Sequence, residues 1–217
     1  MKEHNGHENS LAEIIRSRRS IRSFTTDIPP KDAVKEIIES AILAPYGGAT
    51  GIPLKEIRKI FVLSQKTAPM EKAKEILLAQ IRKGARRLNM ILALMPFLKK
   101  KMQPFSNRLN TLSKDGISGL NEAAYYIIVA EKKGFPPIEK QSIAHSLQNM
   151  WLTATSLGLA FQLISATGMM SKSKPFLKLL GLPEGEYEID GCLVGIPKNH
   201  PEPRADYNVD DFVTWIR

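Results

Sequence analysis

Four arginines and three serines lie within nine residues near the start of the chain, at positions 16–24, in the order Arg-Ser-Arg-Arg-Ser-Ile-Arg-Ser-Phe. Guanidinium groups bind phosphate oxygens in pairs, and serine hydroxyls and loop amides complete such a shell. The plainer interpretation is a solvated basic helix end, where cations suit the helix dipole. The interleaved Ile21 and Phe24 favour a cluster held against a core. We therefore expect an anion site here, with a phosphate as its ligand.

A glycine-containing loop follows the second predicted helix. Pro29-Pro30 opens that helix, its apolar residues recur at helical spacing up to Ile42, and it stops at Ala44-Pro45. The loop at residues 46–53 holds three glycines, which permit tight turns and a close approach of backbone to a ligand. It matches neither a dinucleotide GxGxxG nor a GxxxxGK phosphate loop, so alone it indicates no specific function.

Composition limits the class of protein. With 217 residues, 43% of them hydrophobic, we expect one domain over residues 1–217. The first ten residues are polar with no apolar run behind them, so we expect no signal peptide and a cytoplasmic location.

The single cysteine, Cys192, excludes an internal disulfide and lies in an apolar run typical of a buried thiol. Four scattered histidines show no ligand spacing, so we expect no metal site.

The net charge of +9 comes from one segment, residues 82–114, which has nine basic residues and no acidic ones. The rest of the chain has 22 basic and 22 acidic residues. Within the segment, a mostly apolar run at residues 89–98 precedes three lysines and Met102. We interpret residues 82–114 as an excursion from the domain, with three alternatives open. It contacts an anionic membrane surface through residues 89–102, it is a lid over an apolar pocket, or it packs on the core with a solvated basic end.

Nucleic-acid binding is not expected of this segment. Its only aromatic residues are Phe97 and Phe105, and it contains no known nucleic-acid-binding motif.

The remaining elements alternate between helix and strand, with helices dominating. Ser10 and Glu13 have the spacing of a capping box, so a helix begins near Leu11. The helix at 139–157 is apolar around most of its circumference, which is typical of a core or interface helix. We predict further helices at 70–88 and 174–180, an extended tail at 197–217, and strands at 59–63, 124–130, 161–164 and 187–196.

Several motifs in a fixed order and spacing cover nearly the whole chain outside the basic segment. They are the start at residues 18–24, the Ala44-Pro45 helix exit, Gln-Asn-Met-Trp-Leu-Thr-Ala at 148–154, Leu-Gly-Leu-Pro-Glu-Gly at 180–185, Val-Gly-Ile-Pro at 194–197, and the final Pro203-Arg204. In their order and spacing, these motifs resemble the FMN-dependent nitroreductase family.

The resemblance implies an α+β fold with a mixed central sheet flanked by helices, and an intertwined homodimer that holds FMN at its interface. It also implies an oxidoreductase that passes electrons from NAD(P)H to a nitroaromatic, quinone or similar small acceptor by a ping-pong mechanism. The flavin carries the chemistry in such an enzyme, so we expect no catalytic side chain.

By position in the family motifs, Arg18, Arg19, Ser20 and Arg204 are expected at the phosphate, and Arg22 near the pyrimidine edge of the flavin. Pro45, Tyr46 and Gly47 are expected at the ring, although the loop at 46–53 lacks the family's asparagine and tryptophan. A backbone amide within the segment Ser165, Ala166, Thr167 and Gly168 is expected to face flavin N5. Two alternatives stay open: an FMN-binding protein with little reductase activity, and a peripheral membrane or anion-binding module that acts through residues 82–114.

Overall fold

A computed structural model describes residues 10–47, 51–202 and 205–216 of the chain. The first helix, α1 (Leu11–Ser17), begins where the capping box predicts. The Glu13 amide donates to Ser10 Oγ, and the Ser10 amide donates to the Glu13 carboxylate at 2.7 Å. The polypeptide then continues without regular structure to α2 (Lys31–Ile42), which starts after the predicted Pro29-Pro30.

A four-stranded sheet in the order β1-β2-β4-β3 forms the centre of the molecule. Its strands are β1 (Arg58–Ser64), β2 (Tyr125–Lys132), β3 (Ala160–Leu163) and β4 (Tyr187–Gly195). The sequence resemblance predicts a mixed sheet, but the three pairings among the described residues are all antiparallel. Within this chain the sheet is therefore antiparallel. The strands β2 and β3 do run in the same direction, but β4 lies between them and opposes both.

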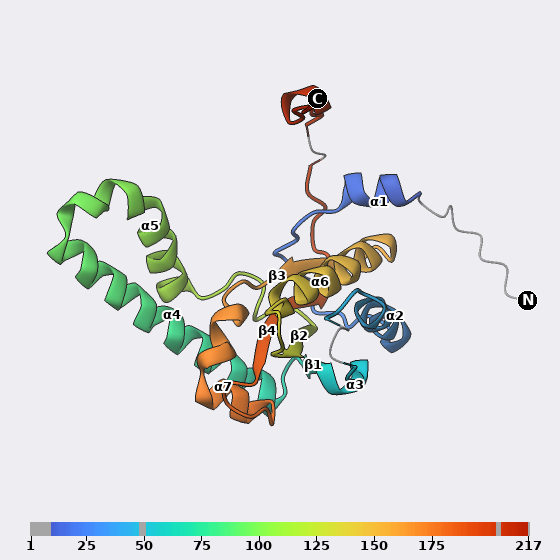
Figure 1. Ribbon diagram of the computed structural model, residues 1–217, viewed down its shortest axis with the longest axis horizontal. Coiled ribbons are helices and arrows are strands. Elements are labelled where there is room, and N and C mark those ends of the chain that lie inside the picture. The colour runs from blue at the N-terminus through green and yellow to red at the C-terminus, as the bar shows by residue number, and fades with distance from the viewer. Residues whose placement is uncertain (1–9, 48–50, 203–204, 217) are drawn as a thin grey trace, which may run out of the picture.

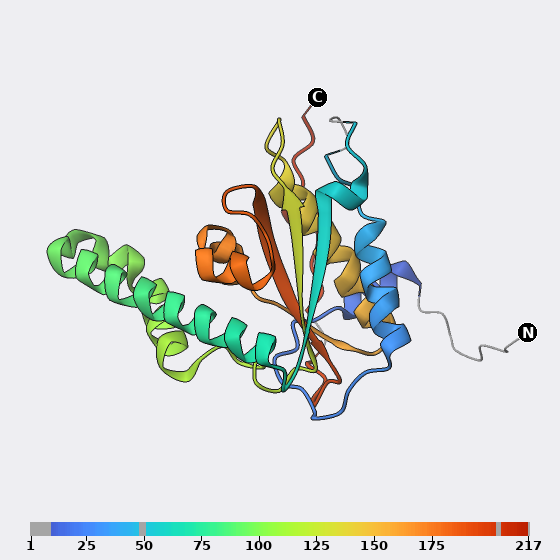
Figure 2. The ribbon, with the colours of Figure 1, turned by 90° about the horizontal axis from the view of Figure 1, so that it is seen from below.

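Helices cover both faces of the sheet. Figure 2 shows α2 and α6 (Glu139–Ser156) on one face, with α4 (Ala68–Leu94) and α7 (Lys174–Leu179) on the other. Successive residues of a strand point to opposite faces, and β2 follows this rule. Tyr126 and Ile128 pack in the cluster with α4 and α7, whereas Ile127 and Val129 pack with α2 and α6. This arrangement confirms the α+β class and the central place predicted for the second strand.

The predicted excursion is a pair of antiparallel helices that extends away from the sheet (Figures 1 and 2). Its first helix, α4, runs 27 residues: Gly84 does not interrupt it, and Pro96 follows directly after its C-cap residue. We had predicted its end at residue 88. A short turn, η2 (Pro96–Leu98), joins it to α5 (Lys99–Asp115). The remaining short elements are α3 (Leu54–Ile57), η3 (Thr167–Lys172) and η4 (Val209–Asp211).

After β4 the chain returns along the N-terminal arm and then leaves the body of the molecule. Pro197 forms a bridge with Phe24, and the Lys198 amide donates to the Ser23 carbonyl at 3.1 Å. Residues 205–216 lie beyond α1 in Figure 1 and carry several exposed apolar side chains. Cys192 is buried in β4, as predicted. In the described part of the chain, no helix is long and apolar enough to cross a membrane.

Candidate functional site

The predicted anion cluster is an extended arm that backbone hydrogen bonds fix to the sheet. The Ile21 amide donates to the Phe161 carbonyl in β3 at 3.1 Å, and the Thr25 amide donates to the Ile196 carbonyl at 2.9 Å. Phe24, at 3% exposed, anchors the arm in the core. The cluster is therefore held in place, as the interleaved apolar residues indicated.

The arginines of the arm are arranged around Trp151 of α6. The Arg18 guanidinium carbon lies 4.0 Å from the centre of the Trp151 ring, and the Trp151 indole N–H donates to the Arg19 carbonyl at 3.0 Å. Arg19 donates to the carbonyls of Arg16 and Arg18, and its Nε donates to the Glu202 carbonyl at 3.2 Å. The sequence favoured a core or interface role for Trp151, but it did not show that this residue positions two of the arginines.

The other residues predicted at the phosphate are exposed to different degrees. Ser20 is half-buried, whereas the Arg22 side chain is exposed and its carbonyl accepts from Ser118 Oγ at 3.2 Å. Arg204 lies outside the described residues. The contact between Arg19 and Glu202 nevertheless brings the C-terminal segment to the arm.

The strand β3 leads from the arm to a cavity of about 370 Å³. Ser165 and Gly168 line this cavity together with Met169, one edge of α6 and Asp190 of β4. Thr167 is buried: its hydroxyl lies 2.6 Å from the Tyr126 hydroxyl, and its amide donates to the Ile164 carbonyl at 2.8 Å. Neither group is therefore free to donate to a ligand. Ala166 packs against the core. Among the described residues, the Ser165 N–H has no acceptor, so it can serve a ligand in the cavity that Ser165 lines. The Ala166 N–H also has no acceptor, but Ala166 is not part of the cavity wall.

Asp190 is a wall residue of the cavity that the sequence analysis did not select. Its Oδ1 accepts the Gly191 amide at 2.8 Å, and the Gly168 amide also donates to it. Burial raises the pKa of Asp190 to about 6, although these two hydrogen bonds act in the opposite direction. The only sequence signal was an acidic residue in the middle of a strand, two positions after Glu188.

The loop residues Pro45, Tyr46 and Gly47 follow α2 and reach the other side of α6. The Pro45 carbonyl accepts from Arg58 Nη2 and from Ser142 Oγ, both at 3.0 Å. Gly47 packs beside Ile138 and helps to line a smaller cavity of about 110 Å³. Tyr46 is exposed.

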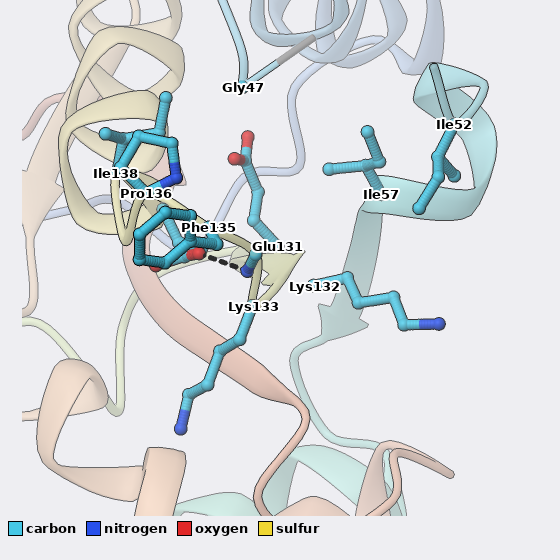
Figure 3. Close-up of a pocket in the computed structure, with 11 residues that line it drawn as sticks. Gly47, Ile52, Ile57, Glu131, Lys132, Lys133, Phe135, Pro136 and Ile138 are labelled. Atoms are coloured by element: carbon cyan, nitrogen blue, oxygen red, sulfur yellow. Dashed lines mark hydrogen bonds between the residues drawn. The ribbon is translucent and has the colours of Figure 1, made fainter. Parts of the chain in front are cut away.

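Figure 3 shows this smaller cavity between the loop, the end of β2 and the start of α6. The Glu131 carboxylate points toward Gly47, whereas Lys132 and Lys133 point away from it. Glu131 is paired with the buried Arg58, with 2.6 Å between Arg58 Nε and its Oε1. Sequence reasoning missed both members of this ion pair, because a charged residue at a strand end is usually exposed.

The structure thus brings together two groups of predicted residues on nearly opposite faces of α6. Lys140 and Ala144 border the larger cavity, while Ser142 contacts the loop. At 100° per residue, Ser142 points about 160° away from both of them. Along the helix, Trp151 and Ser142 are about 13 Å apart at 1.5 Å per residue. In one chain, therefore, the arm and residues 165–168 lie on one face of α6, and the loop lies on the nearly opposite face.

The larger site suits a phosphate ester joined by a linker to a planar ring. The arm offers guanidinium and hydroxyl donors at one end, and the cavity offers a backbone donor at the other. The four residues from Phe161 to Ser165 span about 13 Å at 3.3 Å per residue, which leaves room for a linker. No group of three or more histidine, cysteine or acidic residues suited to a metal ion occurs in the described part of the chain.

A model of the nitroreductase family matches residues 15–196. The chain belongs to the nitroreductase family. This match confirms the resemblance inferred from the motifs, and it includes the arm, the loop and residues 165–168. No match was found among curated proteins.

Solved structures of the family share the fold across nearly the whole chain. A nitroreductase with bound FMN from Bacteroides fragilis has a TM-score of 0.68 at 21% identity, covering 96% of this chain and 100% of that one. A nitroreductase with bound FMN from Desulfitobacterium hafniense has a TM-score of 0.68 at 24% identity, covering 96% and 99%. An FMN- and NADPH-dependent nitroreductase from Sphigopyxis sp. strain HMH has a TM-score of 0.65 at 19% identity, covering 95% and 98%. At these identities the likeness concerns the fold.

Proposed function

We propose that this protein is an FMN-dependent oxidoreductase that takes electrons from NAD(P)H and passes them to a nitroaromatic, quinone or similar small acceptor, by a ping-pong mechanism. The observation that carries the proposal is the arginine arm, which is fixed to β3, together with the cavity to which β3 leads and whose wall includes the unpaired backbone amide of Ser165. Similar structures that contain FMN support the choice of cofactor. A similar protein described as FMN- and NADPH-dependent supports the choice of reductant.

In this proposal the residues of the chain bind the cofactor and stabilise charge. Arg18, Arg19, Ser20 and Arg204 hold the phosphate, and each charge-assisted hydrogen bond contributes roughly 1.5–3 kcal/mol before the costs of ordering. FMN, when bound, carries the two electrons of the reaction. Arg22 places a positive charge at the pyrimidine edge, and an amide of residues 165–168 orients the ring. The open cavity admits the reductant and the acceptor in turn.

We also propose that the protein is an intertwined homodimer with the cofactor at its interface. The position of the loop supports this assembly, because Pro45 to Gly47 lie on the far side of α6 from the arm of the same chain. A second subunit can bring its own loop to the cavity and complete the site. The exposed apolar residues of the C-terminal segment further support a partner. The cytoplasmic location and the absence of a nucleic-acid partner stay predictions.

The visible spectrum of the purified protein tests the function, before and after anaerobic addition of NADH or NADPH. We expect flavin absorption bands that disappear with the nucleotide and return with a quinone or a nitroaromatic compound. The double variant Arg18→Ala/Arg204→Ala is expected to bind FMN roughly a hundredfold more weakly, because it lacks two charged donors to the phosphate. The control Arg86→Ala/Arg87→Ala removes the same charge from α4 and is expected to bind FMN normally.

Two outcomes would count against the proposal. A protein that takes up no FMN would share only the fold of its family. A protein that binds FMN but is not reduced by either nucleotide would be the FMN-binding alternative with little reductase activity.

A further inference from the structure

The two helices of the excursion form a braced hairpin. Asn89 in α4 is the centre of the brace: its Nδ2 donates to Asn110 Oδ1 at 2.9 Å, and its Oδ1 accepts from Ser106 Oγ at 3.0 Å. Closer to the sheet, Arg82 Nε donates to the Ser113 carbonyl at 3.2 Å. These bonds hold the two helices together, and the part of the hairpin beyond Asn89 projects away from the body (Figures 1 and 2).

This distal part, residues 90–105, which we call the tip, is apolar and exposed. Leu94 is 76% exposed and Phe97 is 79% exposed, although both are large apolar side chains. The other exposed apolar residues of the tip are Met90, Ile91, Met95 and Phe105. A contiguous apolar surface at the end of a projection is typical of a contact with a partner or a membrane.

Cations surround this apolar surface. Lys99, Lys100 and Lys101 are exposed in the first turn of α5, and Arg86 and Arg87 are exposed on α4. No acidic residue occurs between positions 82 and 114, so these charges have no acidic neighbour along the hairpin. The lysines also lie at the positive end of the α5 dipole, where cations are disfavoured. An external negative surface would compensate this unfavourable arrangement.

We propose that the tip docks on the surface of an anionic lipid bilayer. Leu94, Met95 and Phe97 enter the boundary between headgroups and acyl chains, while the three lysines contact lipid phosphates. The tip is a convex projection, which suits a broad surface better than a groove-bound ligand. The combination of apolar side chains with cations favours a lipid surface over nucleic acid. Nucleic acid binds cations and stacks on aromatic rings, but it offers no apolar region in which exposed aliphatic side chains could be buried.

A second copy of this chain fits the tip less well. Its net charge is also +9, so it would repel the lysine cluster overall. The exception is its acidic C-terminal segment at residues 205–216, and docking of that segment on the tip would appear as a change of oligomeric state in the tip variants. Docking of the tip on a bilayer does not require a bound flavin.

Co-sedimentation of the full chain with vesicles tests the proposal. We expect binding to mixed phosphatidylglycerol and phosphatidylcholine vesicles, weak binding to pure phosphatidylcholine vesicles, and release by salt. The variant Lys99→Gln/Lys100→Gln/Lys101→Gln is expected to bind anionic vesicles roughly a hundredfold more weakly, at about fivefold per lysine. Leu94→Ser/Phe97→Ser is expected to lose the binding that survives at high salt.

The matched control is Lys31→Gln/Lys55→Gln/Lys178→Gln, which removes the same charge from exposed sites away from the hairpin. It is expected to bind anionic vesicles within a few-fold of the unchanged protein. The proposal would be overturned if the control weakened binding as much as the tip variants, or if neutral vesicles bound equally well. Binding of single-stranded DNA without vesicle binding, or a change of oligomeric state in the tip variants, would also overturn it.

Discussion

Asp190 combines partial burial with a negative charge. It lies in the wall of the larger cavity, and two backbone amides donate to it. These hydrogen bonds favour the ionised form, but burial outweighs them and raises the pKa of Asp190 to about 6. The folded protein therefore holds this proton more tightly than the unfolded chain, in which the carboxyl has its ordinary value of 3.8.

The raised pKa gives the free energy of unfolding a pH dependence. The contribution of Asp190 to stability is fully present below pH 3.8 and is lost as the pH rises through about 6. A difference of this size corresponds to no more than about 3 kcal/mol. We expect Asp190→Asn to be more stable than the unchanged protein at pH 7.5, by about 1–2 kcal/mol, and to lose that advantage at low pH. Urea unfolding of both proteins over this range measures the difference.

The matched comparison is Glu184→Gln, which removes an exposed carboxylate from a surface ion pair with Lys174. Its effect is expected to stay within about 0.5 kcal/mol across the same pH range. An Asp190→Asn variant that is destabilised equally at every pH would show that the two amide hydrogen bonds, and not the charge, determine the behaviour of this site.

For single residues, the sequence predicted the burial of side chains whose environment follows from their own residue type and that of their neighbours in the sequence. Cys192 is buried in an apolar strand, and Phe24 anchors the arm. Asp190 and Arg58 were missed, because their environment depends on strands and helices that are distant in the sequence. The Thr167 hydroxyl likewise forms a hydrogen bond with the Tyr126 hydroxyl and does not line the cavity. No local sequence pattern predicts this contact.

At the scale of elements, Arg58 joins the end of α2 to the sheet. Its guanidinium contacts Glu131 in β2, the carbonyls of Ala41 and Ala44, and Ser142 in α6. The carbonyls at the end of a helix lack their regular helical partners, and Arg58 supplies donors to them. The Ala41 carbonyl also accepts the Ala44 amide at 3.3 Å. Arg58 thereby fixes the start of the loop that holds Tyr46 and Gly47.

Removing one member of this buried ion pair leaves the other as an isolated charge. We expect Arg58→Met to lower the free energy of unfolding by about 3–5 kcal/mol, measured by urea denaturation. The double variant Arg58→Met/Glu131→Met is expected to recover part of this loss, because no buried charge then remains. The control Lys72→Met breaks an exposed pair with Glu75 and is expected to cost less than about 1 kcal/mol. If Arg58→Met lowered the free energy of unfolding by less than about 1 kcal/mol, this expectation would be wrong, and water would have to solvate the remaining Glu131 carboxylate.

The order and type of the elements were largely predictable, because each depends on a local pattern. The capping box set the start of α1, the Pro29-Pro30 pair preceded α2, and apolar runs marked the first part of β2 and the last part of β4. The pairing of the strands was not predictable in the same way. The insertion of β4 between β2 and β3 depends on contacts over long separations, and so does the placement of the loop and the arm on different faces of α6.

At the scale of the whole molecule, exposed apolar residues gather in two places with opposite charge. The tip of the hairpin is surrounded by lysines and arginines. Residues 205–216 contain three aspartates and no basic residue, together with Tyr207, Phe212, Trp215 and Ile216. Trp215 is 82% exposed. An acidic, aromatic segment complements a chain whose net charge is +9, so its expected partner is a second copy of this chain.

This complementarity leads to a prediction about the oligomeric state. We expect a dimer in sedimentation velocity at micromolar concentration, and we expect Phe212→Ser/Trp215→Ser to raise its dissociation constant at least roughly tenfold, because buried aromatic residues dominate interface energies. The control Leu94→Ser/Phe97→Ser removes comparable apolar groups from the tip and is expected to leave the dimer intact. The dimer is expected to weaken with salt, since the contact joins an acidic segment to a basic chain. A monomer at all concentrations, or a tip control that weakens the dimer as much as the tail variant, would contradict this role for the C-terminal segment.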